Sequence, residues 1–197
     1  LDKELRGRRV DYSGEEVGIC HRLSYVQVLP ALPPKEHGGS VDVVDFVSET
    51  TRSLLENPDK MVEPDVGQDL PCLQGRIHID TGDKLRIAEE LVSRGVCSWI
   101  PLTEVAVYRG ERVMNGLFGV PKTGTVEGDR PILRLIMNLV PSNSILRQFQ
   151  GATKNLPHIT SWLSTFIDEG EELRLWQSDM ANAFYLFRLP KGWYKYL

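Results

Sequence analysis

The sequence has few of the residues that build disulfide scaffolds or metal centres. Its 197 residues include only three cysteines, Cys20, Cys72 and Cys97, which stand far apart. An odd number of widely spaced cysteines argues against a disulfide framework and a zinc site, and it is typical of a reducing compartment. The four histidines are scattered in the same way and suggest no ligand cluster.

Long apolar runs are missing as well, so the sequence predicts no membrane span. The first nine residues, LDKELRGRR, are charged and lack the apolar core of a secretory signal. We therefore expect an intracellular protein, cytoplasmic or nuclear, with no membrane partner. Because the chain begins with Leu1 rather than Met, we also expect a piece of a longer polypeptide.

Positive charge is in the minority, but it is unevenly distributed. The net charge is −4, with net −6 over residues 1–103, +3 over 104–155 and −1 over 156–197. The acidic total does not favour a nucleic-acid-binding protein. The basic surplus of the middle segment permits such binding without demonstrating it.

The periodicity of apolar residues predicts a mixed α+β chain. Helices are expected over 41–57, 84–94 and 157–168, and strands over 104–108, 112–120 and 131–139. Turn residues at 108–112 and 122–130 predict two hairpins, and the Pro/Gly-rich stretch 29–40 predicts a loop or linker.

The helix expected over 84–94 has recognisable ends. Asp83 is in the position of an N-cap, and Gly95 is in the position of a C-terminal stop. Its apolar face is predicted to consist of Leu85, Ala88, Leu91 and Val92.

The most informative stretch is LRLWQSDMANAFYLFRLP, residues 173–190. Alternating residues from Leu173 to Ser178 predict a strand that ends at Asp179, and small residues and Phe184 follow. A carboxylate at the end of a strand, beside small residues, is a common way to hold a metal ion against a phosphate. Two alternatives stay open: Asp179 is a cap or turn residue, and Phe184 is a core aromatic.

This stretch resembles the first metal-binding motif of reverse transcriptases, in which an aspartate is followed by a small residue and an aromatic ring. Further pieces upstream are similar to the same family and appear in its order: VSRGV, FGVPKTGT, GDRPILRLIMN and KNLPHI. The resemblance covers about residues 84–197. It implies a right-hand polymerase, with a fingers hairpin and the start of an antiparallel palm sheet with helices. Many members of the family have an Asp-x-Arg group in the strand after Arg-Pro, whereas Leu133-Arg134-Leu135 keeps an Arg but has no Asp.

The resemblance also implies a catalytic centre with two Mg²⁺ (or Mn²⁺) ions. Asp179 would be the catalytic metal ligand, and the Met180 carbonyl would add a second ligand. The backbone N–H groups of Asn182 and Ala183 would meet the nucleotide triphosphate. Phe184 would stack under the sugar and favour deoxynucleotides.

The same resemblance implies that Lys122 and Arg130, on either side of the fingers turn, bind the triphosphate. The ordinary alternative is two solvated charges beside a turn. The implied partners are an RNA or DNA template with its primer and deoxynucleoside triphosphates.

One motif of the family is missing: no Tyr-x-Asp-Asp sequence, which carries its second carboxylate pair, occurs in the chain. We therefore expect an N-terminal fragment of a retroelement reverse transcriptase. The full-length parent would perform template-directed DNA synthesis, and the fragment alone would be inactive. A catalytically dead nucleic-acid-binding or interaction module derived from that fold is the first alternative. An unrelated α+β interaction domain is the second.

The expected division of the chain follows from these motifs. Residues 1–80 form an N-terminal extension with no assigned role, 81–155 a fingers-like region, and 156–197 a partial palm.

Overall fold

The computed structural model describes residues 20–64, 73–147, 165–174, 176 and 178–197, and it confirms a mixed α+β chain. The helices and strands are α2 (Tyr25–Val28), β1 (Val41–Asp42), α3 (Glu49–Glu56), α4 (Lys84–Ser93), β2 (Val107–Tyr108), β3 (Glu111–Arg112), β4 (Gly116–Val126), β5 (Arg130–Asn138), α5 (Val140–Asn143), α6 (Ala183–Leu186) and β6 (Phe187–Arg188). Short 3-10 turns lie between them: η1 (Leu29–Ala31), η2 (Val43–Phe46), η3 (Pro58–Met61), η4 (Leu102–Glu104) and η7 (Lys191–Tyr196).

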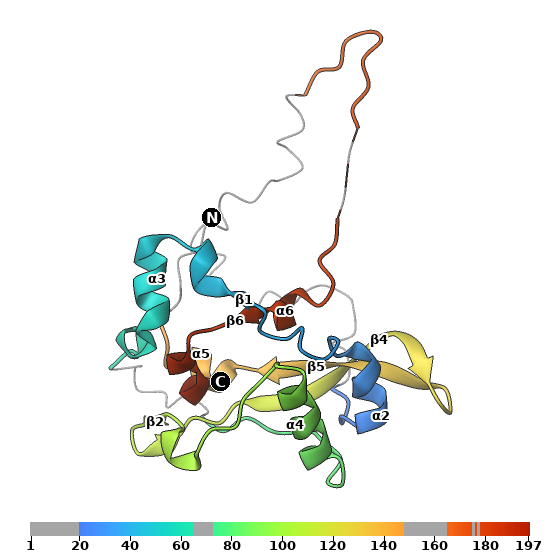
Figure 1. Cartoon of the computed structure of the whole chain (residues 1–197). Helices are drawn as coiled ribbons and strands as arrows, with labels where there is room; N and C mark the ends of the chain where they lie inside the picture. Colours follow the sequence, from blue (N-terminus) through green and yellow to red (C-terminus); the bar gives the residue numbers. More distant parts are fainter. Residues whose placement is uncertain (1–19, 65–72, 148–164, 175, 177) are drawn as a thin grey trace, which may run out of the picture.

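The long hairpin β4–β5 is the largest regular element of the described residues. It pairs antiparallel from Gly116↔Asn138 to Val126↔Arg130, and its far end projects beyond the rest of the chain (Figure 1). Both strands were expected, but the first one continues beyond residue 120, so the turn is Glu127–Asp129 rather than 122–130. The β-branched residues after Lys122 favour the strand, and a register shift between Lys122 and Thr125 absorbs Gly124.

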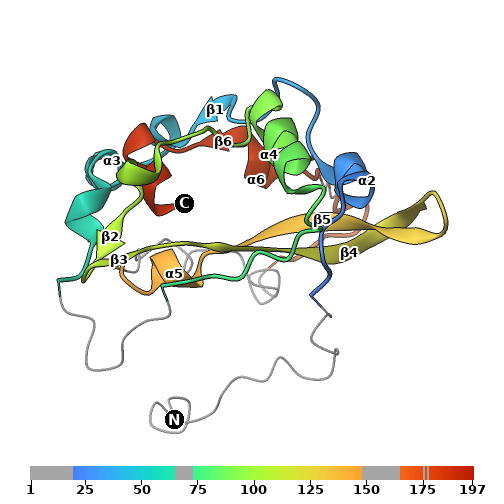
Figure 2. The same ribbon diagram turned by 90° about the horizontal axis from the view of Figure 1, so that it is seen from below.

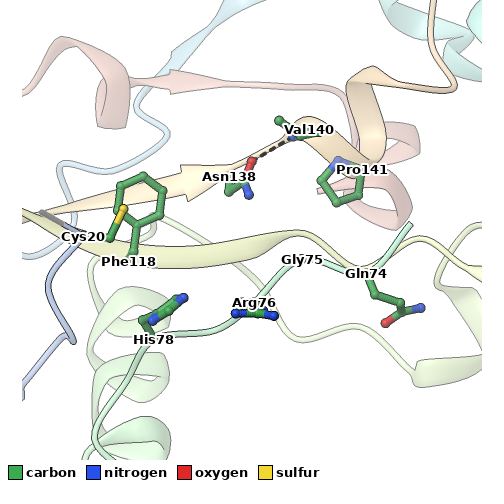
Figure 3. A pocket seen from close by; sticks show the side chains of 9 residues that line it. All are labelled: Cys20, Gln74, Gly75, Arg76, His78, Phe118, Asn138, Val140 and Pro141. Atoms are coloured by element: carbon green, nitrogen blue, oxygen red, sulfur yellow. Dashed lines mark hydrogen bonds between the residues drawn. The ribbon is translucent and has the colours of Figure 1, made fainter. Parts of the chain in front are cut away.

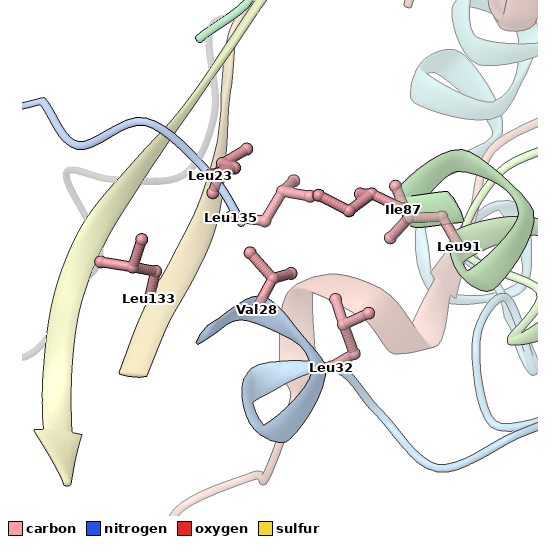
Figure 4. Close-up of a cluster of buried hydrophobic side chains, with 7 residues drawn as sticks. All are labelled: Leu23, Val28, Leu32, Ile87, Leu91, Leu133 and Leu135. Atoms are coloured by element: carbon pink, nitrogen blue, oxygen red, sulfur yellow. The ribbon is translucent and has the colours of Figure 1, made fainter. Parts of the chain in front are cut away.

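The main core lies where helices cover one face of this hairpin. Figure 2 shows β4 and β5 in one layer, with α2, α4 and α6 in a second layer. The buried side chains between them, drawn in Figure 4, are Leu23, Val28, Leu32, Ile87, Leu91, Leu133 and Leu135.

Helix α4 confirms the expected helix over 84–94, but its apolar face was predicted incorrectly. Ile87 and Leu91, one turn apart, are its buried residues, whereas the Leu85 side chain is 62% exposed. Leu91 was predicted correctly, but Ile87 was missed, and the predicted face was rotated by about a quarter of a turn. The buried face is set by contacts with the hairpin and α2, which the helix sequence does not reveal.

Asp83 is at the N-cap position of α4, as predicted, but its side chain makes no cap hydrogen bond to the helix. Instead, the backbone N–H of Tyr25 donates to Asp83 Oδ2 at 2.8 Å, at the start of α2. The Arg86 guanidinium lies 3.8 Å from the centre of the Tyr25 ring, and the two contacts together fasten α2 to α4.

The helix expected over 41–57 is shorter in the structure. It begins at Glu49 because Ser48 Oγ accepts a hydrogen bond from the Thr51 N–H, which caps α3. The preceding residues form β1 and η2. Predicted hairpin 108–112 is confirmed by β2 and β3, whose turn residues Arg109 and Gly110 both have positive φ.

The C-terminal turn η7 packs against α3 and η3. Trp193 Nε1 donates to the Leu55 carbonyl at 2.6 Å, and Tyr196 Oη donates to Asp59 Oδ1 at 2.7 Å. Lys195 Nζ lies 2.6 Å from the same carboxylate oxygen. Contacts therefore join residues 20–64 to both later segments, and the expected N-terminal extension shares their core.

Two elements predicted before Asp179 are not seen in the residues that the structure describes. The helix expected over 157–168 falls largely outside the described residues, and Thr165–Asp168 are not helical. The strand expected to end at Asp179 is absent from its described part, where Leu173, Arg174, Trp176 and Ser178 are all exposed. This part projects away from the sheets (Figure 1), so it has no neighbouring strand with which to pair.

No helix in the described part of the chain is both long and apolar enough to cross a membrane. Its two cysteines, Cys20 and Cys97, are free thiols, and Cys72 lies outside that part.

We predict that Gly38→Ala destabilises the fold by about 2 kcal/mol, because the added methyl group would overlap neighbouring backbone atoms that cannot move aside. A Cβ at Gly38 would lie 2.5 Å from the Arg94 carbonyl oxygen. The control is Gly82→Ala, where a Cβ would meet nothing within 4 Å. Thermal and urea unfolding of the two variants test the difference in stability. Equal stability would contradict the close approach of Gly38 to the backbone at the end of α4.

We further predict that Asp59→Asn lowers the free energy of unfolding at pH 7. The hydrogen bonds from Lys195 and then Tyr196 hold the pKa of Asp59 below its usual 3.8. A lowered pKa in the folded state stabilises the fold above pH 4, and this contribution disappears as the pH falls through the folded pKa. Because the Asp59 side chain is largely exposed, the expected loss is only about 0.5–1 kcal/mol. Urea unfolding at pH 7 and pH 3 should show the gap between wild type and variant closing at the lower pH.

Candidate functional site

The aspartate and aromatic residue of the motif lie at the start of α6. Asp179 and Met180 are exposed and precede a turn, which leads into the helix through Asn182. Asn182 has a left-handed φ of 58°, a conformation that asparagine accepts more readily than most residues. The helix then covers Ala183–Leu186 and is followed directly by β6.

Adjacent aromatic residues of α6 have opposite environments. The Phe184 side chain is 98% exposed, whereas Tyr185 is half-buried and packs against the main core. Burial raises the pKa of the Tyr185 hydroxyl, and the positive charge of Arg134 on β5 opposes this shift. The alternative interpretation of Phe184 as a core aromatic is therefore wrong, because Tyr185 is the residue that anchors α6.

Three cations share one face of the hairpin. Lys122 is paired with Ile132, and alternate residues of a strand lie on the same side, so Lys122, Arg130 and Arg134 face one way. All three are exposed, and the intervening Leu133 and Leu135 are buried on the opposite face. The turn between the strands adds two acidic residues, Glu127 and Asp129.

The two groups of predicted site residues are not brought together at the hairpin tip. Figures 1 and 2 both show the tip of β4–β5 away from α6. Arg130 Nε donates to the Glu127 carbonyl at 3.3 Å, within its own turn. Of these three cations, Arg134 is the one whose charge acts on Tyr185 in α6, and it was assigned no role from the sequence. The alternation Arg130-x-Ile132-x-Arg134 was the signal that could have identified it.

Asp179 is the acidic residue of the motif, and it has no set of metal-ligating neighbours in the described part of the chain. No group of three or more His, Cys, Asp or Glu side chains there is placed to hold a metal ion. Two catalytic ions require more carboxylate oxygens than one aspartate supplies. The described residues thus do not fit a complete two-ion centre.

An open depression of about 300 Å³ lies elsewhere, at the base of the hairpin (Figure 3). Arg76 and His78 line it from an extended segment, Phe118 lines it from β4, and Asn138 lines it from the end of β5. None of the residues predicted from the motif lies in it.

No protein-family model, curated protein sequence or solved structure matches this chain.

We predict that Phe184→Ala changes the free energy of unfolding by less than about 0.5 kcal/mol, as for other exposed positions. The control is Trp193→Ala. Trp193 is buried with Leu55 and Met61, so its truncation should lower the free energy of unfolding by about 3 kcal/mol. Urea unfolding measures both. A large loss for Phe184→Ala would mean that the ring packs against the protein and is not available to a ligand.

Proposed function

We propose that this chain forms the fingers and first palm segment of a retroelement-type reverse transcriptase. The observation that carries the proposal is the ring of Phe184, which is 98% exposed on a helix that begins four residues after Asp179. Single exposed apolar residues are ordinary on protein surfaces, so exposure alone does not indicate a ligand. What supports a ligand role for Phe184 is its place after Asp179, Ala181 and Ala183, in the order of the family motif.

The arrangement suits a deoxynucleotide at α6. The first turn of a helix has N–H groups without intrahelical partners, so the Asn182 and Ala183 amides suit a phosphate. Phe184 offers a flat apolar surface against the sugar, where its bulk disfavours a ribose 2′-hydroxyl. Ala181 and Ala183 are small enough to let the nucleotide approach.

The cationic face of β4–β5 supplies the complementary charge. A nucleoside triphosphate brings about four negative charges, which Lys122, Arg130 and Arg134 oppose in part. Lys122 and Arg130 lie near the projecting end, on the face of the hairpin opposite the α6 layer, so they would reach a nucleotide at α6 only if the end of the hairpin both closed and twisted. Arg134 lies on the same outer face, opposite the core, where it would neutralise a template phosphate.

Two Mg²⁺ or Mn²⁺ ions, when bound, would activate the primer hydroxyl and stabilise the leaving group. Asp179 and the Met180 carbonyl contribute only part of their ligands, so the remaining carboxylates would come from other parts of the polymerase. The role of this chain is then to present one carboxylate, bind the triphosphate and select the sugar.

A binding module derived from the same fold is the second candidate. It is favoured by the lack of a complete ligand set among the described residues, combined with a cationic hairpin face that needs no metal. Such a module would hold RNA or DNA through phosphate contacts and would not extend a primer.

Primer extension tests the two candidates. We predict that a polypeptide that continues this reading frame past Leu197 extends a DNA primer on an RNA template, with a rate at least about 10³-fold lower for Asp179→Asn. Asp168→Asn removes the same charge from the same projecting segment and should leave the rate within about twofold. Binding of the primer–template without extension would favour the module. Equal rates for the two variants would contradict a metal-ligand role for Asp179.

A further inference from the structure

Residues 38–42, predicted to lie in a linker and at the start of a helix, bridge two parts of the fold. The Gly38 N–H donates to the Arg94 carbonyl at 2.9 Å, at the C-terminal end of α4. The next amide, Gly39 N–H, donates to the Tyr185 carbonyl at 2.8 Å, in α6. Two successive amides thus connect the main core on one side with the helix that carries Phe184 on the other.

The bridge continues as a parallel strand pair. Val41 pairs with Phe187, and Asp42 pairs with Arg188. The side chains of the second pair also form a two-pronged ion pair, in which Arg188 Nε and Nη2 each lie 2.6 Å from an oxygen of Asp42. Planar, two-point contacts of this kind fix geometry as well as distance.

The two glycines are required by space and by backbone conformation. A Cβ at Gly38 would lie within 2.8 Å of three backbone atoms of Arg94, Gly95 and Val96. Gly39 has a φ of +59°, and a Cβ there would lie 3.2 Å from the Gly95 carbonyl oxygen. The approach of the bridge to α4 therefore leaves no room for a side chain.

Helix α6 needs such support because it is only four residues long. A helix of this length is not stable by itself, so its position depends on tertiary contacts. These contacts include the packing of Tyr185 on the core, the hydrogen bond from Gly39 to Tyr185, and the pairing of the adjoining strand β6 with β1. The ring of Phe184 makes no comparable contact, so its position follows from the backbone on either side of it.

We infer that residues 38–42 are a brace that fixes α6 to the core, and that Asp42 and Arg188 are positioning residues for the ring of Phe184. The brace itself follows from the contacts described. Only its consequence for nucleotide selection rests on the proposed function: a ring that excludes a 2′-hydroxyl by its bulk must be held in place to within about 1 Å.

Hydrogen exchange of the 197-residue chain tests the brace without any catalytic activity. In Asp42→Asn, we expect the amides of residues 183–189 to exchange on the order of tenfold faster, while those of α4 stay unchanged. Asp45→Asn is the matched control, since Asp45 acts on Arg188 through its charge alone. Arg188→Lys keeps the charge but loses the two-point contact and should give an intermediate effect. Equal exchange at 183–189 in Asp42→Asn and Asp45→Asn would overturn the brace.

The effect of the brace on nucleotide selection is tested in the DNA-synthesising polypeptide described above. Asp42→Asn should lower the ratio of kcat/KM for deoxynucleotides over ribonucleotides by roughly three- to tenfold, because the loosened ring admits the 2′-hydroxyl. Asp42→Glu should restore part of the ratio, and Asp45→Asn should not alter it. Faster exchange with an unchanged ratio would overturn the positioning role. If no polypeptide containing the chain synthesises DNA, the proposed function is wrong, and the exchange result alone decides the brace.

Discussion

The burial of one face of β5 is the constraint on which most of the described structure depends. Leu133 is fully buried and Leu135 nearly so, and the side chains of α2, α4 and α6 that touch them form the main core. Because side chains alternate along a strand, the same burial turns Arg130 and Arg134 to the opposite, solvent-exposed face. A single period-two pattern therefore produces both the core and the cationic surface. A shift by one residue would exchange the two faces and remove both.

Features set by neighbouring residues were predictable from the sequence. The hairpins over β2–β3 and β4–β5 and the helix after Asp83 were expected because turn glycines and apolar periodicity act locally. Features set by distant partners were not predictable. The Asp83 carboxylate accepts a hydrogen bond from Tyr25 rather than from its own helix, and the buried face of α4 is determined by its packing against the hairpin. Residues 38–42 are composed like a linker, yet they form a bridge because their contacts are Arg94 and Tyr185.

The candidate site shows the same division between local and distant information. The order Asp179, small residue, Phe184 is a local motif, and the structure adds that the ring is exposed while its neighbour Tyr185 is anchored. The strand expected before Asp179 does not form in its described part, since a strand needs hydrogen-bonding neighbours that this part lacks. Arg134 was passed over although the segment keeps the Arg of the family's Asp-x-Arg group and lacks only its Asp. The alternation of Arg130, Ile132 and Arg134 could have placed the two arginines on one face, and the strand register adds Lys122 to them.

The packing of η7 on α3 joins the C-terminal residues to a segment in the first third of the chain, and this has a consequence for how the protein is made. Trp193 bonds to a residue 138 positions earlier, and Tyr196 to one 137 positions earlier. Contacts between residues so distant in sequence form slowly, and they cannot form on the ribosome until Tyr196 has left the exit tunnel. During synthesis, Leu55 and Met61 therefore lack the cover of Trp193 until the last residues emerge, whereas Leu23, Val28 and Leu32 find their partners on the hairpin earlier. A chaperone that binds exposed apolar surface would have its opportunity at α3 and η3 in that interval.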